Sequence, residues 1–289
     1  MRVLITGGTG QLARALVAAA PEHWQVHSPG EVDLDITQPS MVREAFDRLQ
    51  PELLINTAAY TAVDRAENEP DKAFSVNTEG ARTLAEICAE AGARMLHLST
   101  DFVFDGRKSS PYEPHDAPHP LSVYGSSKRE GERQVLEVLG DNVVVLRTAW
   151  LYAAGSRNFV TSMLERMQNG KALKIVCDQV GTPTWTRTLA DAIWRMARKP
   201  GLHGNWHFTD AGVASWYDFA VAIQEEALAV ELLSQPVLIE PVRSEAFKTA
   251  ATRPFYSVLD KTRTWEALGI DPVHWRICLR GMLKEMAGG

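Results

Sequence analysis

Two side chains near the middle of the sequence, Tyr124 and Lys128, have the types and the spacing for proton transfer. Residues four apart lie on one face of a helix, so the phenol and the ammonium group can share a pocket. A phenol alone has a pKa of about 10 and is a poor acid at neutral pH. A neighbouring ammonium group favours the phenolate and is expected to lower that pKa. We therefore predict that Tyr124 donates a proton to a carbonyl oxygen that receives hydride, with help from Lys128.

Two hydroxyls stand at the end of a predicted strand, where they can act on the same carbonyl. The apolar run 95–98 is followed by Ser99 and Thr100. Doubly wound sheets bind ligands at the carboxyl ends of their strands. The Thr100 hydroxyl can hydrogen-bond the carbonyl oxygen there and fix it for attack. The alternative role for these hydroxyls is to cap a helix or a turn.

A glycine-rich turn follows the first predicted strand and precedes a helix. Gly7, Gly8 and Gly10 lie in this turn, and the spacing is G-x-x-G-x-x-A with Ala13 in the last small-residue position. Glycines let the backbone approach a pyrophosphate, and the N-terminus of the helix favours the anion. The turn predicts a dinucleotide site, and a purely structural turn is the alternative.

The second predicted strand bears on the choice of dinucleotide. It ends at Val26-His27-Ser28, with no Asp or Glu where an acceptor for the ribose 2′-hydroxyl is expected. A carboxylate there is typical of NAD-binding proteins. The choice between NADPH and NADH therefore stays open, and the pattern slightly favours NADPH.

The elements that position these residues follow from the alternation of short apolar runs with helical periodicity. Such a pattern predicts an α/β fold with a doubly wound, Rossmann-like parallel sheet. The stretch 104–120 contains four prolines and is expected to be a long loop, a kind of loop that often carries function. Helices are expected at 71–91, 122–139, 158–169, 188–198 and 215–229.

Regular alternation weakens beyond residue 147, which indicates a smaller lobe built against the sheet. We expect an NAD(P)-binding domain over 1–150 and a smaller sugar-nucleotide-binding lobe over 151–289. The pattern also allows the chain to cross between the two lobes. No composition shift marks the boundary.

The composition excludes several classes of protein. The 289 residues carry a formal charge of −6, which provides no bulk positive field for nucleic acid or anionic lipid. No apolar stretch approaches the length of about 18 residues that a membrane span needs. The three cysteines are scattered and the histidines form no ligand motif, so no catalytic metal is predicted. We expect a cytoplasmic protein with reduced thiols.

The glycine spacing resembles the short-chain dehydrogenase/reductase superfamily, particularly its extended branch. Further segments resemble the dTDP-4-dehydrorhamnose reductase family within it, and together they span nearly the whole chain. Ala13 departs from the family's usual glycine. The segments are Thr9–Leu12, Asn56–Glu67, Ser99–Gly106, Pro120–Gly125, Arg147–Tyr152, Asn158–Phe159, Asp178–Thr184, Trp216–Asp218 and Arg253–Pro254.

This resemblance implies an oxidoreductase of dTDP-rhamnose biosynthesis. Such enzymes use NADPH or NADH to reduce the 4-keto group of a dTDP-4-keto-6-deoxyhexose, which gives dTDP-L-rhamnose. The implied catalytic residues are Thr100, Tyr124 and Lys128. The implied cofactor-binding residues are Gly7, Gly10, Gln11, Leu12, Asp35, Ile36, Ala59, Tyr60, Thr61, Tyr124 and Lys128. The implied substrate-binding residues are Thr100, Asp101, Trp150, Asn158, Thr182 and Arg253.

Several alternatives stay open from the sequence. Trp150 could stack on a sugar or base, whereas most tryptophans only pack in a core. Arg253 could clamp a diphosphate or form a surface ion pair. A homodimer, and a divalent ion that supports assembly, are also left open.

Two other functions compete with reduction. One is a sugar-nucleotide epimerase or dehydratase on the same scaffold. Phe102 argues against a dehydratase, because dehydratases that resemble this scaffold have Asp-Glu after the strand-end Thr, and here the order is Thr100-Asp101-Phe102. The other is a regulatory subunit, since the beta subunit of methionine adenosyltransferase resembles these reductases. The presence of the whole catalytic set argues for an enzyme.

Overall fold

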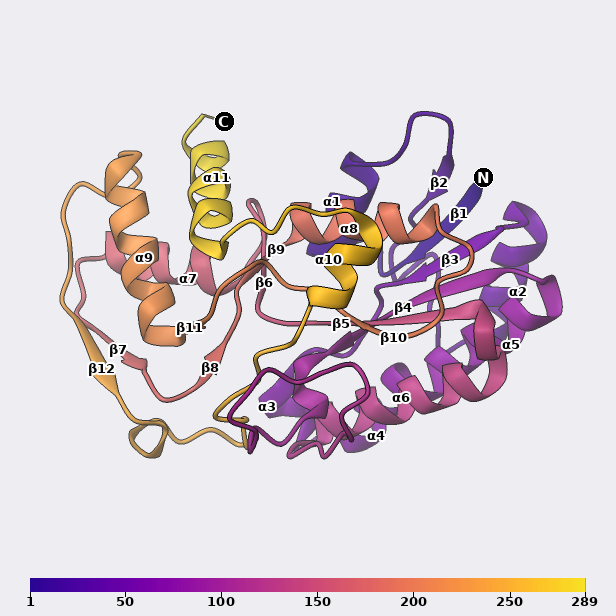
Figure 1. The fold of residues 1–289 in the computed structure, drawn as a ribbon, viewed down its shortest axis with the longest axis horizontal. Coiled ribbons are helices and arrows are strands. Elements are labelled where there is room, and N and C mark those ends of the chain that lie inside the picture. Colours follow the sequence, from indigo (N-terminus) through magenta and orange to yellow (C-terminus); the bar gives the residue numbers. More distant parts are fainter. Residues whose placement is uncertain (289) are drawn as a thin grey trace.

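A parallel sheet of six strands forms the centre of the molecule in a computed structural model that describes residues 1–288. Every neighbouring pair of strands runs in the same direction. The strands have the spatial order β10 (Gly204–His207), β5 (Val143–Thr148), β4 (Arg94–Thr100), β3 (Leu53–Asn56), β1 (Arg2–Thr6) and β2 (Gln25–His27) (Figure 1). The predicted α/β class with a parallel sheet is confirmed.

Helices cover both faces of this sheet. Side chains alternate between the faces of a strand, so Val3 and Ile5 of β1 pack with α1 (Gln11–Ala18) and α8 (Thr186–Ala197). Leu4 packs on the opposite face with α2 (Pro39–Leu49), α5 (Ala81–Ala91) and α6 (Val123–Leu139). The predicted doubly wound arrangement is therefore confirmed.

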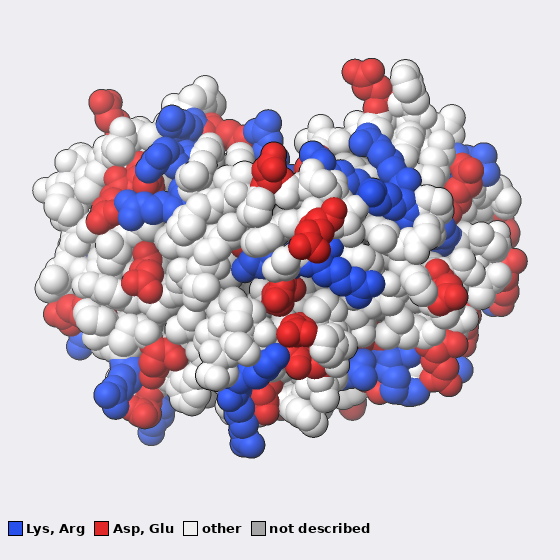
Figure 2. All heavy atoms as spheres, in the orientation of Figure 1, with Lys and Arg blue, Asp and Glu red and all other residues white. Residues whose placement is uncertain are grey.

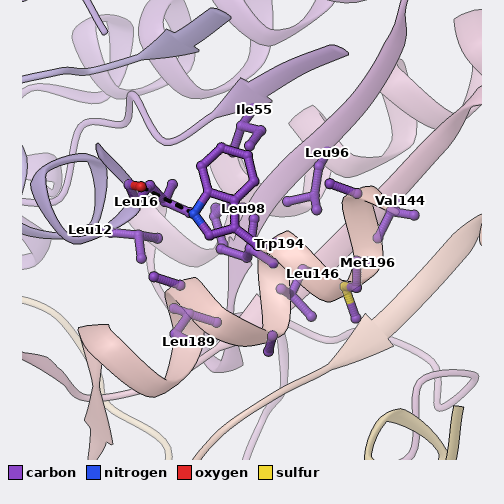
Figure 3. Close-up of a cluster of buried hydrophobic side chains, with 14 of the residues drawn as sticks. Leu12, Leu16, Ile55, Leu96, Leu98, Val144, Leu146, Leu189, Trp194 and Met196 are labelled. Carbon is purple, nitrogen blue, oxygen red and sulfur yellow. Dashed lines mark hydrogen bonds between the residues drawn. The ribbon is translucent and has the colours of Figure 1, made fainter. Parts of the chain in front are cut away.

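The layer formed by α1 and α8 is held by packing and by one hydrogen bond. Trp194 of α8 is buried and donates its indole Nε1–H to the backbone oxygen of Leu16 in α1, at 3.1 Å. Figure 3 shows this bond beside Leu96 and Leu98 of β4. Residues far beyond 150 thus complete the core beneath the first strands. The helix α10 (Thr262–Leu268) adds Leu268 to the same cluster.

The helix expected at 71–91 is present but is not a regular α-helix throughout. It begins as α4 (Pro70–Phe74), widens into the π-helix η1 (Ser75–Gly80) and continues as α5. π-helical turns inside α-helices are frequent at functional sites. Here the wide turn lies against α6, where a Cβ atom at Gly131 would stand only 2.1 Å from the backbone oxygen of Asn77.

A second group of helices and short strands forms a lobe beside the sheet, on the left in Figure 1. Apolar side chains of α7 (Phe159–Gln168), α9 (Trp216–Ala229) and α11 (Trp275–Gly288) share one buried cluster. The parallel strands β7 (Leu173–Val176) and β12 (Ile239–Val242) contribute to it. The helices expected at 158–169 and 215–229 are thus confirmed to within one residue at each end.

The remaining elements are short. Two further strand pairs join β6 (Leu151–Tyr152) to β9 (Thr184–Trp185) and β8 (Val180–Gly181) to β11 (Ala214–Ser215). The other short elements are α3 (Val63–Ala66), η2 (Asp101–Val103), η3 (Gly140–Asn142) and η4 (Ser244–Ala246).

The chain crosses between the sheet and the second lobe more than once. It leaves the sheet after β5, returns for α8 and β10, and then leaves again for α9. The helix expected at 188–198 is α8, so it belongs to the layers of the sheet. The division at residue 150 stays a prediction.

Acidic and basic side chains are interspersed on the face that Figure 2 shows, and no large basic patch stands out there. Among residues 1–288, no helix is long and apolar enough to cross a membrane. The three cysteines are free thiols.

Candidate active site

A cavity of about 520 Å³ lies along the carboxyl ends of the sheet strands. All residues predicted to contact a cofactor line it. They are Gly7, Gly10, Gln11, Leu12, Asp35, Ile36, Ala59, Tyr60, Thr61, Tyr124 and Lys128. The strand order places β2 at one end of the sheet and β5 next to β10 at the other, and residues that follow β2 and β5 both line the cavity. An elongated ligand can therefore cross the sheet edge, as doubly wound folds allow.

The glycine turn is built for close backbone approach. Gly7 has a φ of +71°, a conformation that favours glycine. A Cβ atom at Gly8 would stand 2.2 Å from the backbone oxygen of Ser28, so a side chain there would collide with the loop after β2. Ala13 is fully buried, so the last small-residue position lies in the core beneath the turn. The turn fits the predicted role of holding a pyrophosphate.

Three residues that line the cavity each have a buried side-chain polar atom with no hydrogen-bond partner among the described residues. These atoms are Oε1 of Gln11 and the hydroxyls of Ser99 and Thr148. The Gln11 amide nitrogen is already used, because Nε2 donates to the backbone oxygen of Leu151 at 3.2 Å. Buried polar groups are normally hydrogen-bonded. These atoms thus fit a polar ligand in the cavity.

Local hydrogen bonds hold the turn at Asp35 and Ile36, where the adenosine end of a cofactor is predicted. Asp35 Oδ1 accepts hydrogen bonds from the backbone N–H of Thr37 at 2.9 Å and from its hydroxyl at 2.7 Å. Ile36 packs on Gly80 of η1, where a Cβ atom would stand 2.9 Å from its side chain. The side chain of Glu31 also lines the cavity near this end.

Helix α6 brings Tyr124 and Lys128 to the other end of the cavity. The helix begins where the Ser122 hydroxyl accepts a hydrogen bond from Gly125 N at 3.1 Å. A Cβ atom at Gly125 would stand 2.3 Å from the backbone oxygen of Phe102, so glycine lets the helix lie directly against η2. This contact places Tyr124 beside Thr100.

The ammonium group of Lys128 is held inside the protein. Lys128 is 2% exposed, and Nζ donates to the backbone oxygen of Leu98 at 2.6 Å. Burial lowers the pKa of Lys128 to about 8, and the charge of Glu132 partly opposes this shift. Lys128 is thus still mainly charged at neutral pH.

The expected lowering of the Tyr124 pKa by Lys128 is wrong. Burial raises the pKa of Tyr124 to about 12, the Thr100 hydroxyl lowers it, and the charge of Asp101 raises it. Loss of solvent penalises the phenolate, while the Lys128 ammonium is directed to Leu98 O. Tyr124 therefore keeps its proton at neutral pH, which is the state that a proton donor needs.

Thr100 and Asp101 form a buried pair at the end of β4. The Thr100 hydroxyl lies 3.1 Å from Asp101 Oδ1 and accepts a hydrogen bond from Phe102 N at 3.2 Å. Burial raises the pKa of Asp101 to about 6, although neighbouring hydroxyls of Ser257 and Thr100 oppose the shift. Phe102 itself packs edge-on against the Tyr124 ring, with centroids 5.7 Å apart.

The predicted substrate-binding residues of the second half have structural partners in this structure. Asn158 caps α7 by accepting from Thr161 N at 3.2 Å, and its amide donates to Ala153 O at 2.7 Å. The Thr182 hydroxyl donates to Gly212 O at 3.0 Å. Their roles toward a substrate stay predictions.

Arg253 makes a two-pronged ion pair with Asp64 of α3. Its Nη2 and Nη1 atoms lie 2.7 and 3.1 Å from the two carboxylate oxygens. The pair is partly exposed and connects the segment before Pro254 to the helix that follows the loop after β3. Of the two roles left open by the sequence, the ion pair is present, and diphosphate binding stays a prediction.

Both faces of the Trp150 indole are covered by the protein. Trp216 stacks on one face, with centroids 3.5 Å apart and 7° between the planes. A Cβ atom at Gly181 would stand 2.7 Å from Cε2 of Trp150. Because the Trp216 ring covers one face of the Trp150 indole, Gly181 lies against the opposite face of that indole. Face-to-face stacking of Trp150 on a ligand, as the sequence suggested, therefore requires this sandwich to open.

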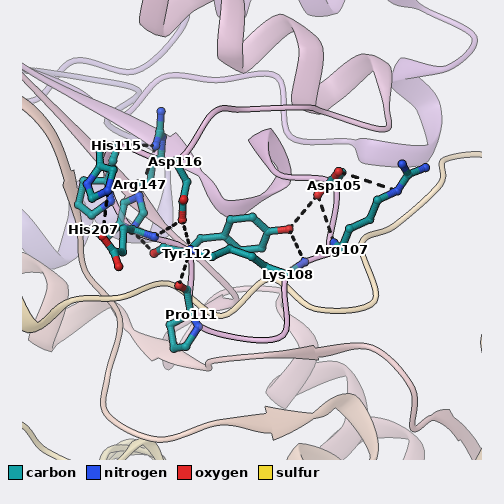
Figure 4. A network of polar contacts seen from close by, with 11 residues as sticks. Asp105, Arg107, Lys108, Pro111, Tyr112, His115, Asp116, Arg147 and His207 are labelled. Carbon is teal, nitrogen blue, oxygen red and sulfur yellow. Dashed lines mark hydrogen bonds and ion pairs between the residues drawn. The ribbon is translucent and has the colours of Figure 1, made fainter.

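The loop 104–120 is ordered by a polar and aromatic network (Figure 4). Tyr112 stacks on Phe104, with centroids 4.1 Å apart, and donates its hydroxyl to Asp105 at 2.8 Å. Arg147 of β5 donates to the backbone oxygen of Pro114 at 3.2 Å. The expected long loop is confirmed, and its place is fixed by contacts from the sheet.

Sequence reasoning missed several cavity-lining residues. Thr148 and Leu151 follow a predicted strand. The expectation that ligands bind at the carboxyl ends of strands, which pointed to Thr100, applies to them as well. Glu31 lies a few residues beyond the end of the second strand, where an acceptor for the ribose 2′-hydroxyl was expected. Nothing in the sequence alone singles out Arg65 and Lys72, which reach the cavity from helices that follow β3.

No group of three or more His, Cys, Asp or Glu residues within 1–288 is arranged to hold a metal ion. The arrangement supports acid-base chemistry by Tyr124 next to a dinucleotide-sized cavity.

Comparisons with known proteins show the family to which the chain belongs. The model of the family described as RmlD substrate binding domain matches residues 1–287. The dTDP-4-dehydrorhamnose reductase of Aggregatibacter actinomycetemcomitans is 40% identical over 288 residues, which cover 97% of this chain and 98% of the relative. A probable dTDP-4,6-dihydroxy-2-methyloxan-3-one 4-ketoreductase of Streptomyces antibioticus is 44% identical over 289 residues, which cover 99% and 96%.

A solved structure shows the same fold over the whole length. The dTDP-4-dehydrorhamnose reductase of Bacillus anthracis, in complex with NADP, superposes with a TM-score of 0.92 at 33% identity. The superposition covers 98% of this chain and 99% of that one. On the match of the family model and of these full-length relatives, the chain belongs to the RmlD substrate binding domain family.

Proposed function

We propose that the protein reduces the 4-keto group of a dTDP-4-keto-6-deoxyhexose with NADPH or NADH, and so converts dTDP-4-dehydrorhamnose to dTDP-L-rhamnose. One observation carries this proposal. A single cavity has the glycine turn in its lining together with Tyr124 and Lys128. Relatives that match over the full length are named as reductases of this type.

When bound, the nicotinamide cofactor supplies the hydride, and the protein supplies binding, orientation and a proton. Backbone N–H groups of the turn around Gly7 and Gly10 hold the pyrophosphate, and Asp35 and Ile36 contact the adenosine end. Lys128 contacts the nicotinamide ribose and keeps a positive charge beside the site. These assignments are supported by the lining of the cavity.

Tyr124 donates the proton that converts the developing alkoxide to an alcohol. Its raised pKa keeps the phenol protonated at neutral pH. The Thr100 hydroxyl, beside Tyr124, hydrogen-bonds the same substrate oxygen. Donors held in place before the reaction stabilise negative charge without reorganisation.

The sugar nucleotide binds between the sheet and the second lobe. Substrates of doubly wound folds lie beyond the carboxyl ends of the strands. We propose that residues 1–150 supply most of the cofactor site and that 151–289 supply the substrate lobe through Asp178–Thr184 and Arg253. Formation of a homodimer stays a prediction. The free thiols support the cytoplasmic location that we propose.

The direct test follows NADPH and NADH oxidation optically with dTDP-4-dehydrorhamnose and with other 4-keto-6-deoxy nucleotide sugars. The purified chain, without any partner protein, should oxidise the cofactor only when a 4-keto sugar is present. Activity that needs a second protein would favour the regulatory-subunit alternative. Absence of oxidation with every sugar would contradict the proposed reaction.

The competing dehydratase function is tested separately. Elimination of water needs an acid and a base near C5 and C6, and Phe102 places an apolar ring where a dehydratase would have Glu. That ring packs against Tyr124. Incubation with dTDP-glucose and NAD⁺ should therefore yield no 4-keto-6-deoxy product, as followed by absorbance in alkali. An enzymatic rate of its formation would establish the dehydratase instead.

A further inference from the structure

Asp101 has a carboxyl group in an unusual position for a charged side chain. It is 2% exposed, and its Oδ2 atom has no hydrogen-bond partner of normal geometry among the described residues, although the Ser257 hydroxyl lies near the carboxyl group. Its Oδ1 atom lies 3.1 Å from the Thr100 hydroxyl. A buried carboxylate with an unpartnered oxygen is costly, whereas a protonated carboxyl at the same place loses much less solvation.

The hydrogen bonds of Thr100 depend on that proton. A hydroxyl has one proton to donate and two lone pairs that accept. Phe102 N already donates to the Thr100 oxygen at 3.2 Å. If Asp101 is ionised, it can only accept, so Thr100 directs its single proton at the carboxylate and has none for a ligand.

If Asp101 is protonated, the direction of this bond reverses. The Asp101 O–H donates to Thr100, which then accepts from both Phe102 N and Asp101. Its own proton becomes free to point away from them, toward Tyr124 and the substrate oxygen beside it. Phe102 connects the two residues, because its N–H donates to the Thr100 oxygen at 3.2 Å and its ring packs against that of Tyr124, with centroids 5.7 Å apart.

We propose that Asp101 is a positioning residue whose proton turns the Thr100 hydroxyl toward the substrate ketone. This inference rests on the proposed function, because it assigns the direction of a hydrogen bond within that reaction. No bond to carbon is made or broken by Asp101, and its proton stays between the two oxygens during turnover.

The groups around Asp101 allow its carboxyl group to gain and lose a proton within the pH range in which the enzyme can be assayed. Hydroxyls face it from Thr100, from Tyr124 of α6 and from Ser257 of the segment packed on η2. No charged side chain is among the groups that shift its pKa, and burial raises that pKa to about 6. The active, protonated form is therefore present below about pH 6 and is lost as the pH rises above it.

The test measures kcat with saturating cofactor and sugar nucleotide from about pH 5 to pH 8. Wild-type kcat should fall about tenfold for each pH unit well above the Asp101 pKa. Asp101→Asn keeps a donor to Thr100, because its amide cannot ionise, and should give a kcat that no longer falls over this range. Asp101→Leu has no donor and should lower kcat at least about tenfold at every pH.

A matched control separates Asp101 from other buried acids. Asp210 is also buried, and burial raises its pKa to about 6, but its carboxylate accepts from Trp185 N and Thr188 and not from Thr100. Asp210→Asn should keep the wild-type pH profile. Infrared difference spectra between acidic and neutral pH should show protonated carboxyl bands from both residues, and Asp101→Asn should remove only the band that Asp210→Asn leaves in place.

Three results would overturn the inference and leave the proposed reaction intact: a flat wild-type profile, an Asp101→Asn profile that still falls above about pH 6, or loss of the fall in Asp210→Asn. Failure of the wild-type protein to reduce any 4-keto sugar is a different result, because it would contradict the proposed function itself. NADPH affinity, measured by fluorescence, should be the same in all variants and shows that each has folded.

Discussion

The indole of Trp150 lies parallel to that of Trp216, 3.5 Å away between centroids, at the point where the chain leaves the sheet. Trp150 has a φ of +49°, which is rare for a large side chain. Its backbone oxygen accepts from Thr184 N at 3.1 Å. The stack and this bond hold a strained residue in place between β5 and β6, so Trp150 has a structural role whatever it contributes to the substrate site.

Trp150→Ala should therefore destabilise the protein as well as weaken substrate binding. Loss of a packed tryptophan costs about 3 kcal/mol in the free energy of unfolding. Urea denaturation measures this loss, and NADPH titration shows whether the cofactor site survives. A variant with wild-type stability and only a raised KM would show that Trp150 acts on the substrate alone.

Gly181→Ala tests the other side of the sandwich. The added Cβ atom would stand 2.7 Å from Cε2 of Trp150, so the indole must shift or the backbone must move. Overpacking of this kind costs about 1–3 kcal/mol. Gly92→Ala is not a suitable control because its φ is positive. Gly201→Ala is suitable, since no atom lies within 4 Å of its Cβ position, and it should denature at the wild-type urea concentration.

Tyr124→Phe keeps the ring and removes the proton donor. Turnover should fall by about 10²-fold or more, while NADPH affinity stays near that of the wild type. Because the pKa of Tyr124 is raised to about 12, the wild-type phenol should not itself cause a loss of activity below about pH 10. Tyr152→Phe is the matched control, since that phenol is buried in the second lobe. Full activity of Tyr124→Phe would refute the assignment.

Local sequence patterns located several residues of this site, but they predicted neither the long-range packing around it nor the pKa of Tyr124. Strand-end hydroxyls and the glycine turn follow from local patterns, so Thr100 and Gly7 could be located from the sequence alone. The crossing of α8 back to the sheet depends on contacts between residues as distant as Leu16 and Trp194, and no local pattern encodes it. The pKa of Tyr124 depends mainly on burial, which the four-residue spacing of Tyr124 and Lys128 does not reveal.

Lys128→Met should weaken cofactor binding and lower turnover together. In the wild type the pKa of Lys128 is lowered to about 8, so the charged form is present below that pH and is lost as the pH rises through it. NADPH affinity should therefore fall as the pH rises through about 8, and Lys128→Met should show a low affinity that does not change there. Lys261→Met is the control, because burial also lowers the pKa of Lys261 to about 8 and this residue does not line the cavity. Unchanged pH dependence in Lys128→Met would refute the assignment.

The last prediction concerns Glu132, one helical turn beyond Lys128. Glu132 and Arg147 are both buried and form a bidentate ion pair with two distances of 2.8 Å. Glu132→Gln leaves the Arg147 guanidinium buried with only neutral partners and should lower the free energy of unfolding by about 3–5 kcal/mol. Replacing both residues by methionine removes both charges and should restore most of that loss.

The stabilisation from the Glu132–Arg147 ion pair is expected to be lost as the pH falls. Although burial alone would raise it, the pKa of Glu132 is lowered by Arg147 below its unfolded value. The stabilisation is therefore fully present above the unfolded pKa of about 4.3 and is lost as the pH falls through the lower folded value. The double variant should lose this acid-dependent part of its stability, as measured by urea denaturation at several pH values. If the Glu132→Gln variant were as stable as the double variant, the ion pair would not be what holds α6 to β5.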